Sequence, residues 1–353
     1  MEVVNYVMIA FAVLAAIDRI AGNKLGMGRE FEKGIEMIGL LALAMVGVLV
    51  MTPLIAHGLR YIADFFPNFF DFSIVPATFL ANDSGGAHLA MEVANSEEIG
   101  YFNGLVVASM MGATVSIAIP FAMQLTKEEL HKDILFGIIC GIITIPTGCV
   151  VAGIMMGIGI PELIKNMIPL IIFSLICTVG LLKFEKITIR IFNGIGLFMK
   201  AIITVGLIAG IIEFLTGTKI LPYIDTLENS MKIIISIMCV IAGAFPLVYL
   251  LKKVLKKPLE KLGEKLGIND TAAFGFLTSA ANYITTFDMM KRMDKKGVVL
   301  NSAFLVSASF AFVDHMAFTM SFKPEYTLHV VIGKLISGVS AVVLANILVN
   351  KRK

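Results

Sequence analysis

The stretch PATFLANDSGGAHLA, residues 76–90, places three polar side chains and two glycines inside a chain that is otherwise rich in apolar residues. An unpaired Asp at a helix centre in a bilayer costs at least about 2.5 to 3.5 kcal/mol, so the carboxylate of Asp83 indicates a functional site. Gly85 and Gly86 favour a backbone break, and non-helical backbone at membrane depth survives only where protein or a water-filled cavity surrounds it. We expect this stretch to be the tip of a broken, site-forming segment; the alternative is a polar loop above the membrane.

The composition of the whole chain agrees with a membrane setting. Hydrophobic residues make up 58% of the 353 residues and charged residues 16%, whereas soluble domains have about 45–50% and about 25%. Many apolar runs reach the roughly 20 residues that a bilayer crossing requires. The sequence therefore predicts an all-α polytopic membrane protein, with residues 1–353 forming a single transmembrane domain.

Nine apolar runs are long enough to be full transmembrane helices. Two further stretches, 72–90 and 271–287, are too short or too polar to assign by hydropathy alone, so the charge of their flanking loops must decide how they run. The nine runs are residues 3–21, 35–57, 102–123, 134–158, 166–183, 191–216, 231–251, 298–321 and 326–350.

Loop charge predicts that both doubtful stretches are re-entrant. The loop at 252–270 holds six lysines and the loop at 288–297 holds four basic residues, and cytoplasmic loops carry an excess of Lys and Arg. The stretch between them should therefore enter and leave on the inner side. By contrast, 58–71 contains only Arg60 and 91–101 contains no basic residue, so the first stretch should dip in from outside. This topology places the N-terminus outside and the C-terminus inside.

Weak internal similarity suggests an inverted repeat. Under the predicted topology each half has four crossings and one dip, with the second half inverted, which is a common build of secondary transporters. We expect a first repeat at 1–160, a connecting helix at 161–186 and a second repeat at 187–353. The matching features are Phe79-Leu80 with Phe276-Leu277, Asn103 and Ser109 with Asn301 and Ser307, and Pro53 with Pro246.

The loop at 252–270 contains an amphipathic stretch, KKVLKKPLEKLGEKLG. Its leucines recur at helical spacing with lysines on the other face, which is typical of a helix lying on an anionic lipid surface. We therefore expect membrane lipids to be partners of this helix.

A second carboxylate also falls within an apolar run. Asp314 lies about 16 residues into its span, or about 24 Å at 1.5 Å per residue, and His315 follows it. This depth places both in the outer half of the membrane. The alternative for Asp314 is a carboxylate paired with a neighbour to hold two helices together. His88 and His315 could shuttle protons, although a lone membrane histidine is more often hydrogen-bonded packing.

These groups predict a binding site for a small polar cation. Asp83 or Asp314 would neutralise an ammonium group, Asn and Ser side chains would hydrogen-bond a second polar group, and Phe79 or Phe312 could add cation–π attraction. We favour Asp83 because its neighbouring glycines let the backbone open a cavity. The predicted substrate-binding residues are Asn82, Asp83, Ser84, Gly85, Gly86, Asn282, Thr285, Asp314 and His315. We find no metal-ligand set, nucleophile motif or cofactor motif, so we expect no catalytic residue, metal or cofactor.

Seven motifs, spread in order over nearly the whole chain, closely resemble the EutH ethanolamine permeases of bacterial ethanolamine-utilisation operons. The resemblance implies uptake of ethanolamine across the cytoplasmic (inner) membrane. The motifs are NDSGG at 82–86, SMMGATVSIAIP at 109–120, GIITIPTGC at 141–149, NMIPLII at 166–172, GAFPLVYLLKK at 243–253, NYITTFDMMKRMD at 282–294 and FVDHMAF at 312–318.

The chain departs from the family pattern at three positions. A Cys commonly precedes the Asp where this chain has Asn82, a Pro stands where it has Thr285, and a small residue stands where it has Asp288. These positions fall at the expected tips of the two dips. The departures therefore leave open a changed preference among small amines.

Other functions remain open on sequence grounds. The alternatives are a channel or secondary transporter for another small cation or amine and, less favoured, a membrane-embedded enzyme. The expected partners are ethanolamine, membrane lipids, protons as a coupling ion and further copies of the chain in a homo-oligomer; no nucleic acid is expected.

Overall fold

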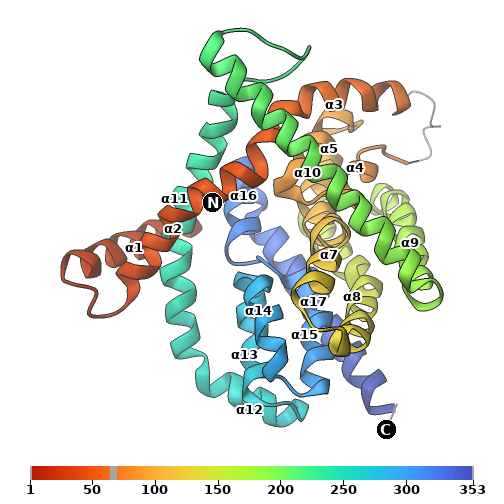
Figure 1. The fold of residues 1–353 in the computed structure, drawn as a ribbon. Helices are drawn as coiled ribbons and strands as arrows, with labels where there is room; N and C mark the ends of the chain where they lie inside the picture. The colour runs from red at the N-terminus through yellow and green to blue at the C-terminus, as the bar shows by residue number, and fades with distance from the viewer. Residues whose placement is uncertain (1, 64–69, 352–353) are drawn as a thin grey trace.

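The computed structural model describes residues 2–63 and 70–351, and every regular element in those ranges is a helix (Figure 1). The α-helices are α1 (Glu2–Ile20), α2 (Met27–Leu41), α3 (Gly47–Ala63), α4 (Ile74–Phe79), α5 (Ala87–Val93), α6 (Glu97–Tyr101), α7 (Ile119–Leu125), α8 (Glu128–Met155), α9 (Ile160–Lys183), α10 (Glu185–Thr216), α11 (Leu227–Val254), α12 (Lys256–Leu266), α13 (Asp270–Ala281), α14 (Tyr283–Met289), α15 (Lys295–Ala308), α16 (Asp314–Phe322) and α17 (Thr327–Lys351). Wider π-helical turns occupy Ala42–Val46, Asn82–Gly86, Phe102–Gly112 and Thr114–Ala118, and short 3₁₀ turns occupy Met290–Arg292 and Pro324–Tyr326.

Seven helical stretches in the described part of the chain are long and apolar enough to cross a membrane. They coincide with seven of the nine predicted runs, which confirms a multi-pass helical membrane protein. The seven stretches are Met27–Ala63, Glu97–Leu125, Glu128–Met155, Ile160–Lys183, Glu185–Thr216, Leu227–Val254 and Pro324–Lys351. The run at 3–21 forms the 19-residue helix α1, which is not among these seven.

The expectation of one unbroken helix at 298–321 is wrong. Helix α15 ends at Ala308, α16 begins at Asp314, and Phe310 between them has φ +58°. The backbone N–H of Phe310 donates to the carbonyl oxygen of Ser279 (3.2 Å), and that of Phe312 donates to Ala280 (3.0 Å). The chain breaks here because its backbone donors bond to α13 instead of to the preceding turn.

Both predicted dips are hairpins that end beside their own starting points. In the first hairpin, residues 71–95, the backbone N–H of Asn95 donates to Oδ2 of Asp71 at 2.8 Å. In the second hairpin, residues 269–294, the backbone N–H of Asn269 donates to Oδ1 of Asp294 at 2.9 Å. The ends of the second hairpin lie at the lower edge of Figure 1 beside α12, and α3 and α5 lie in its upper part. In each hairpin the two ends of the segment therefore lie side by side.

Helices α8, α15 and α17 form a closely packed trio, in which backbone lies against backbone. A Cβ atom added at Gly148 of α8 would lie 2.1 Å from the carbonyl oxygen of Gly333 in α17. One added at Gly137 would lie 2.3 Å from the carbonyl oxygen of Val299 in α15. Small residues at such crossings let membrane helices approach closely.

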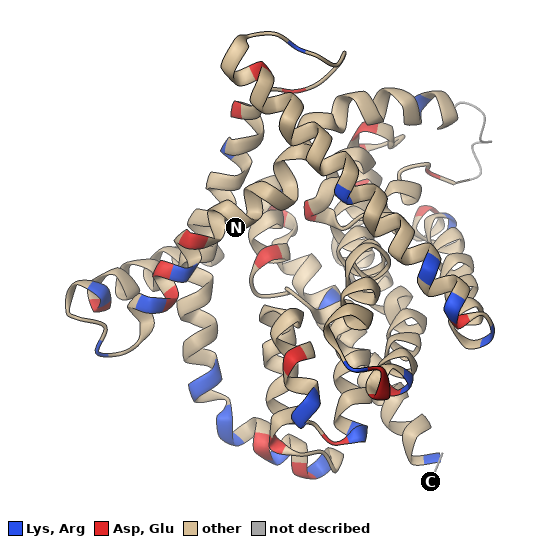
Figure 2. Ribbon diagram, viewed as in Figure 1, with Lys and Arg blue, Asp and Glu red and all other residues tan. Residues whose placement is uncertain are grey.

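The outer surface suits a lipid environment. Large apolar side chains are exposed along α9 and α10, including Leu175, Ile176, Leu197 and Phe198, and exposed apolar surface of this extent is typical of a membrane face. Lys and Arg gather at the lower edge in Figure 2, around the predicted amphipathic helix α12. Charge is therefore kept mostly at the ends of the long helices.

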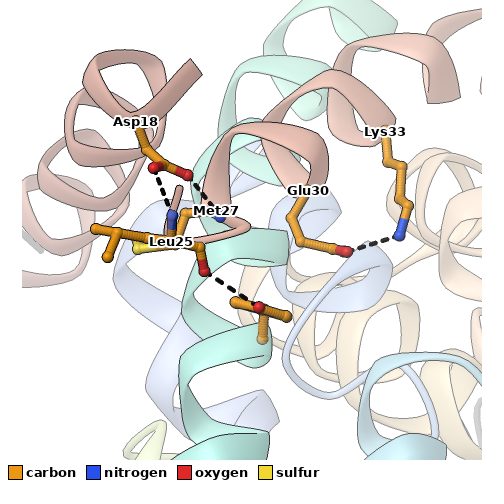
Figure 3. A network of polar contacts seen from close by, with 6 residues as sticks. Asp18, Leu25, Met27, Glu30 and Lys33 are labelled. Carbon is orange, nitrogen blue, oxygen red and sulfur yellow. Dashed lines mark hydrogen bonds and ion pairs between the residues drawn. The ribbon is translucent and has the colours of Figure 1, made fainter. Parts of the chain in front are cut away.

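Asp18 holds the turn between α1 and α2 together (Figure 3). Its carboxylate is buried, with 3% of the residue exposed, and accepts hydrogen bonds from the backbone N–H groups of Leu25 (2.8 Å), Met27 (2.9 Å) and Gly28 (3.0 Å). The N-terminal N–H groups of a helix have no partner within the helix. Asp18 supplies those partners for α2, so its role is structural.

Candidate functional site

The tip of the first hairpin has the irregular backbone that its glycines predict. Ser84 has φ −99° and ψ 39°, outside helical values, and Gly85 has φ +94°. Only glycine adopts a positive φ of this kind without strain. A Cβ at Gly85 would also lie 2.6 Å from Cγ2 of Val48. Residues 82–86 therefore separate α4 from α5 and present their polar side chains at a break.

Three polar side chains gather at this break. Asn82 is fully buried, and neither its Oδ1 nor its Nδ2 has a hydrogen-bond partner among the described residues. Asp83 and Ser84 are half-buried, and the Ser84 hydroxyl donates to Oδ1 of Asp83 at 3.1 Å. A buried polar group left without a partner costs about 1–3 kcal/mol, so the Asn82 amide favours a bound polar group or water at this position.

The second carboxylate lies at the same place. Asp314 begins α16 directly after the break at 309–313, is half-buried, and interacts electrostatically with Asp83. Its Oδ1 is buried without a hydrogen-bond partner in the part of the chain that the structure describes. The two acids that the sequence analysis treated as alternatives therefore belong to one site.

Lys334 of α17 is the functional candidate that the sequence analysis missed. It is fully buried; its Nζ donates to the carbonyl oxygen of Ser109 at 2.6 Å and lies 3.0 Å from Nδ1 of His315. A protonated Lys334 can only donate, and Nδ1 of a neutral His315 would then accept. Lys334 also interacts electrostatically with Asp83. Lys334 lies about 12 Å into its apolar span, where a charged side chain costs as much free energy in lipid as Asp83 does. The rule that a charged residue at membrane depth indicates a functional site therefore applies to Lys334 as well as to Asp83.

The second hairpin contributes less to this site than predicted. The Asn282 side chain accepts from the backbone N–H of Ile284 at 2.8 Å and so caps α14, while Thr285 is exposed. Thr286 is buried and receives a hydrogen bond from Ser279 at 3.0 Å. Asp288 is not at the tip as expected: it is exposed at the C-terminal end of α14 and pairs with Lys291 at 2.7 Å.

Tyr283 connects the second hairpin to the acids, which sequence reasoning did not foresee. It is 2% exposed, its ring centroid lies 4.7 Å from that of Phe310, and it interacts electrostatically with Asp83 and Asp314. Its position depends on the break at 309–313, because that break brings Phe310 against α13 and α14.

Aromatic rings surround the region, though not in the roles first expected. Phe79 packs edge-to-face on Phe173, with ring centroids 5.1 Å apart, and Phe312 is half-buried. His88, in α5 of the first hairpin, packs edge-to-face against Phe322 of α16 with ring centroids 4.7 Å apart, and its Nδ1 has no hydrogen-bond partner among the described residues. No three His, Cys, Asp or Glu side chains in residues 2–63 and 70–351 lie close enough to hold a metal ion.

These features define a multi-pass helical membrane protein whose charged groups meet where its helices break. A family model described as "Ethanolamine utilisation protein, EutH" matches residues 1–348, and the chain belongs to this family. A "Probable ethanolamine permease EutH" of Listeria monocytogenes is 40% identical over 354 residues, covering 99% of this chain and 94% of the relative. The protein of the same name from Salmonella typhimurium is 35% identical over 392 residues, covering 99% and 96%.

An "Uncharacterized protein YxeR" of Bacillus subtilis is 33% identical over 346 residues, covering 98% of this chain and 94% of the relative. No solved structure matches the chain.

Proposed function

We propose that this protein carries protonated ethanolamine across the cytoplasmic membrane. The relatives from Listeria monocytogenes and Salmonella typhimurium are named as probable ethanolamine permeases. The observation that carries the proposal is the pair of half-buried carboxylates, Asp83 and Asp314, at two helix breaks, with one oxygen of Asp314 unpartnered among the described residues.

The polar groups at the site suit both ends of ethanolamine. The ammonium group would lie between Asp83 and Asp314, where charge-assisted hydrogen bonds are strongest. The hydroxyl group two carbons away would reach the amide of Asn82, whose Nδ2 and Oδ1 have no hydrogen-bond partner among the described residues. An amino acid would bring a carboxylate toward the same acids, so we expect it to be rejected.

A carrier is needed because ethanolamine is charged. For a primary amine with a pKa of about 10.4, the neutral fraction is about one part in 10³ at pH 7. At pH 5 the neutral fraction is about a hundredfold smaller. Only the neutral form crosses lipid readily. The carrier should therefore matter most for growth when external pH and external amine are both low.

We further propose nine crossings, made by the seven long stretches together with α1 and the α15–α16 pair, and two re-entrant hairpins. The N-terminus would lie outside and the C-terminus inside. An inverted repeat of 1–160 and 187–353 around a connecting helix is supported by two matching hydrogen bonds. Asn103 donates to Oγ of Ser73 at 2.8 Å, and Asn301 donates to the carbonyl oxygen of Ala272 at 2.9 Å. Each asparagine ties the start of a hairpin to the helix that follows it.

Uptake of labelled ethanolamine into proteoliposomes tests the transport function. Saturable, protein-dependent uptake that shows counterflow is expected of a carrier. Uptake without saturation or counterflow would indicate a channel, and a chemically altered product would indicate an enzyme. Absence of protein-dependent uptake would exclude ethanolamine as the substrate.

Cysteine labelling tests the topology. Single cysteines at 58–63 and at 91–101 should react with an impermeant thiol reagent from outside, and those at 252–270 and 288–297 only from inside. Opposite-side labelling of the two ends of either hairpin would make that hairpin a crossing and remove the inverted repeat.

A further inference from the structure

We propose that Lys334 is an internal cation that limits the site to one exchangeable positive charge, so that each ethanolamine taken up is exchanged for one proton. This inference rests on the proposed function.

The geometry separates one inaccessible cation from two accessible anions. Lys334 is fully buried, with its Nζ held by Ser109 (2.6 Å) and beside His315 (3.0 Å). Asp83 and Asp314 are each partly exposed, although Oδ1 of Asp314 is buried. A substrate ammonium can therefore meet the carboxylates but cannot take the place of Lys334.

Charge balance then fixes how many cations the site accepts. Two carboxylates and one ammonium leave a net charge of −1, and a net charge away from bulk water is costly. The other titratable groups facing these residues do not change the sum, because His315 accepts a hydrogen bond and is neutral while Tyr283 and Cys149 are uncharged in their protonated forms. One further cation completes the balance.

Without substrate, the available cation is a proton on the carboxylate pair. When ethanolamine binds, its ammonium pairs with the ionised carboxylates and that proton leaves to water, so no charge is created or lost. If the empty site returns with its proton, one cycle moves one ammonium inward and one proton outward. The net result equals the movement of one neutral amine, which a membrane potential neither drives nor opposes.

Binding to the purified full-length protein tests the exchange directly. In the acidic range we expect about one proton to be released for each ethanolamine bound. The affinity for ethanolamine should fall by up to about tenfold for each unit by which the pH is lowered, because protons compete with the ammonium for the carboxylates. The release is measured with a pH indicator in weak buffer. Binding with no proton release at any pH from 5 to 9 would overturn the exchange.

Proteoliposomes provide a second measurement that needs no variant. An inside-acid pH gradient should drive accumulation faster than in protein-free vesicles and to the same final level, whereas an inside-negative potential set with K⁺ and valinomycin should not drive accumulation. Accumulation driven by the potential would overturn the exchange while leaving ethanolamine transport intact. Absence of both binding and uptake would instead overturn the proposed function, and with it this inference.

Variants test the role of Lys334 itself. In Asp314→Asn the positive charge of Lys334 neutralises the one remaining carboxylate, that of Asp83. No net negative charge is left for the substrate ammonium, so ethanolamine binding should weaken about 10- to 150-fold. Adding Lys334→Gln removes the internal cation and should restore most of that loss, a rescue that a merely structural lysine would not produce. Lys200→Gln, on the exposed surface of α10, is the matched control and should rescue nothing. Equal affinities for Asp314→Asn and for the folded double variant would overturn the role of Lys334.

Discussion

The two hairpins share one frame but differ in the chemistry of their tips. Each is closed at its base by an Asn backbone N–H that donates to an Asp carboxylate, and each is tied to the following helix by an asparagine. At the first tip, the Asn82 amide has no partner among the described residues and Asp83 contributes a carboxyl group. At the second tip, Asn282 caps α14 and Ser279 bonds to Thr286.

This difference separates binding from support. Paired polar groups lower the energy of the fold and are not available to a ligand, whereas unpaired ones await a partner. The first hairpin therefore supplies the site, and the second positions Tyr283 and the break at 309–313 beside it. Each of the following variants tests whether the first hairpin binds the substrate while the second only supports the site.

Replacing the charged tip residue should give the largest effect. A hydrogen bond to a charged group contributes about 1.5 to 3 kcal/mol, so Asp83→Asn should weaken ethanolamine binding about 10- to 150-fold while the protein still inserts and folds. Binding and melting temperature of detergent-purified protein are measured together. Unchanged affinity in a folded Asp83→Asn variant would remove Asp83 from the site.

Gly85→Ala should disturb the first tip through its backbone. A residue other than glycine at positive φ costs about 1–2 kcal/mol, and the new Cβ would also press on Val48. We expect a lower melting temperature and reduced transport. Gly194→Ala is the control, because Gly194 lies in α10 with nothing within 4 Å of an added Cβ. Equal behaviour of the two variants would contradict a strained tip.

Asn282→Ala should affect stability but not binding. Loss of a helix N-cap costs about 1 kcal/mol, so the melting temperature should fall while ethanolamine affinity stays within about twofold of the wild type. A drop in affinity as large as that of Asp83→Asn would place the second tip in the site and remove the division between the hairpins.

Asp288→Ala should have the smallest effect. Its hydrogen bond to Lys291 lowers the pKa of Asp288, so any stabilisation is present above the usual Asp pKa and is lost as pH falls through the lowered value. The pair is exposed, with 68% of the Asp288 side chain accessible, and exposed pairs contribute little. Substrate preference among small amines should be unchanged, and a shift in that preference would return Asp288 to the site.

Much of the fold follows from hydropathy and loop charge. These two signals find the long helices and both hairpins, since lysine-rich loops on either side of 271–287 require it to turn back. The break at 309–313 escaped because SFAFV is apolar, and only its hydrogen bonds to Ser279 and Ala280 show that it is not helical. The acids at the site were recognisable from their cost in lipid. The grouping of these acids with Lys334 and Tyr283 was not recognisable from the sequence, because it depends on how segments that are distant in the chain pack together.

The glycine contacts within the α8–α15–α17 trio limit how Lys334 can move. A displacement of α17 along its axis would drive the carbonyl oxygen of Gly333 past Gly148, where not even a methyl group fits. Lys334 therefore lies next to a backbone-to-backbone contact with α8, and a larger side chain at Gly148 would force α17, and Lys334 with it, to shift.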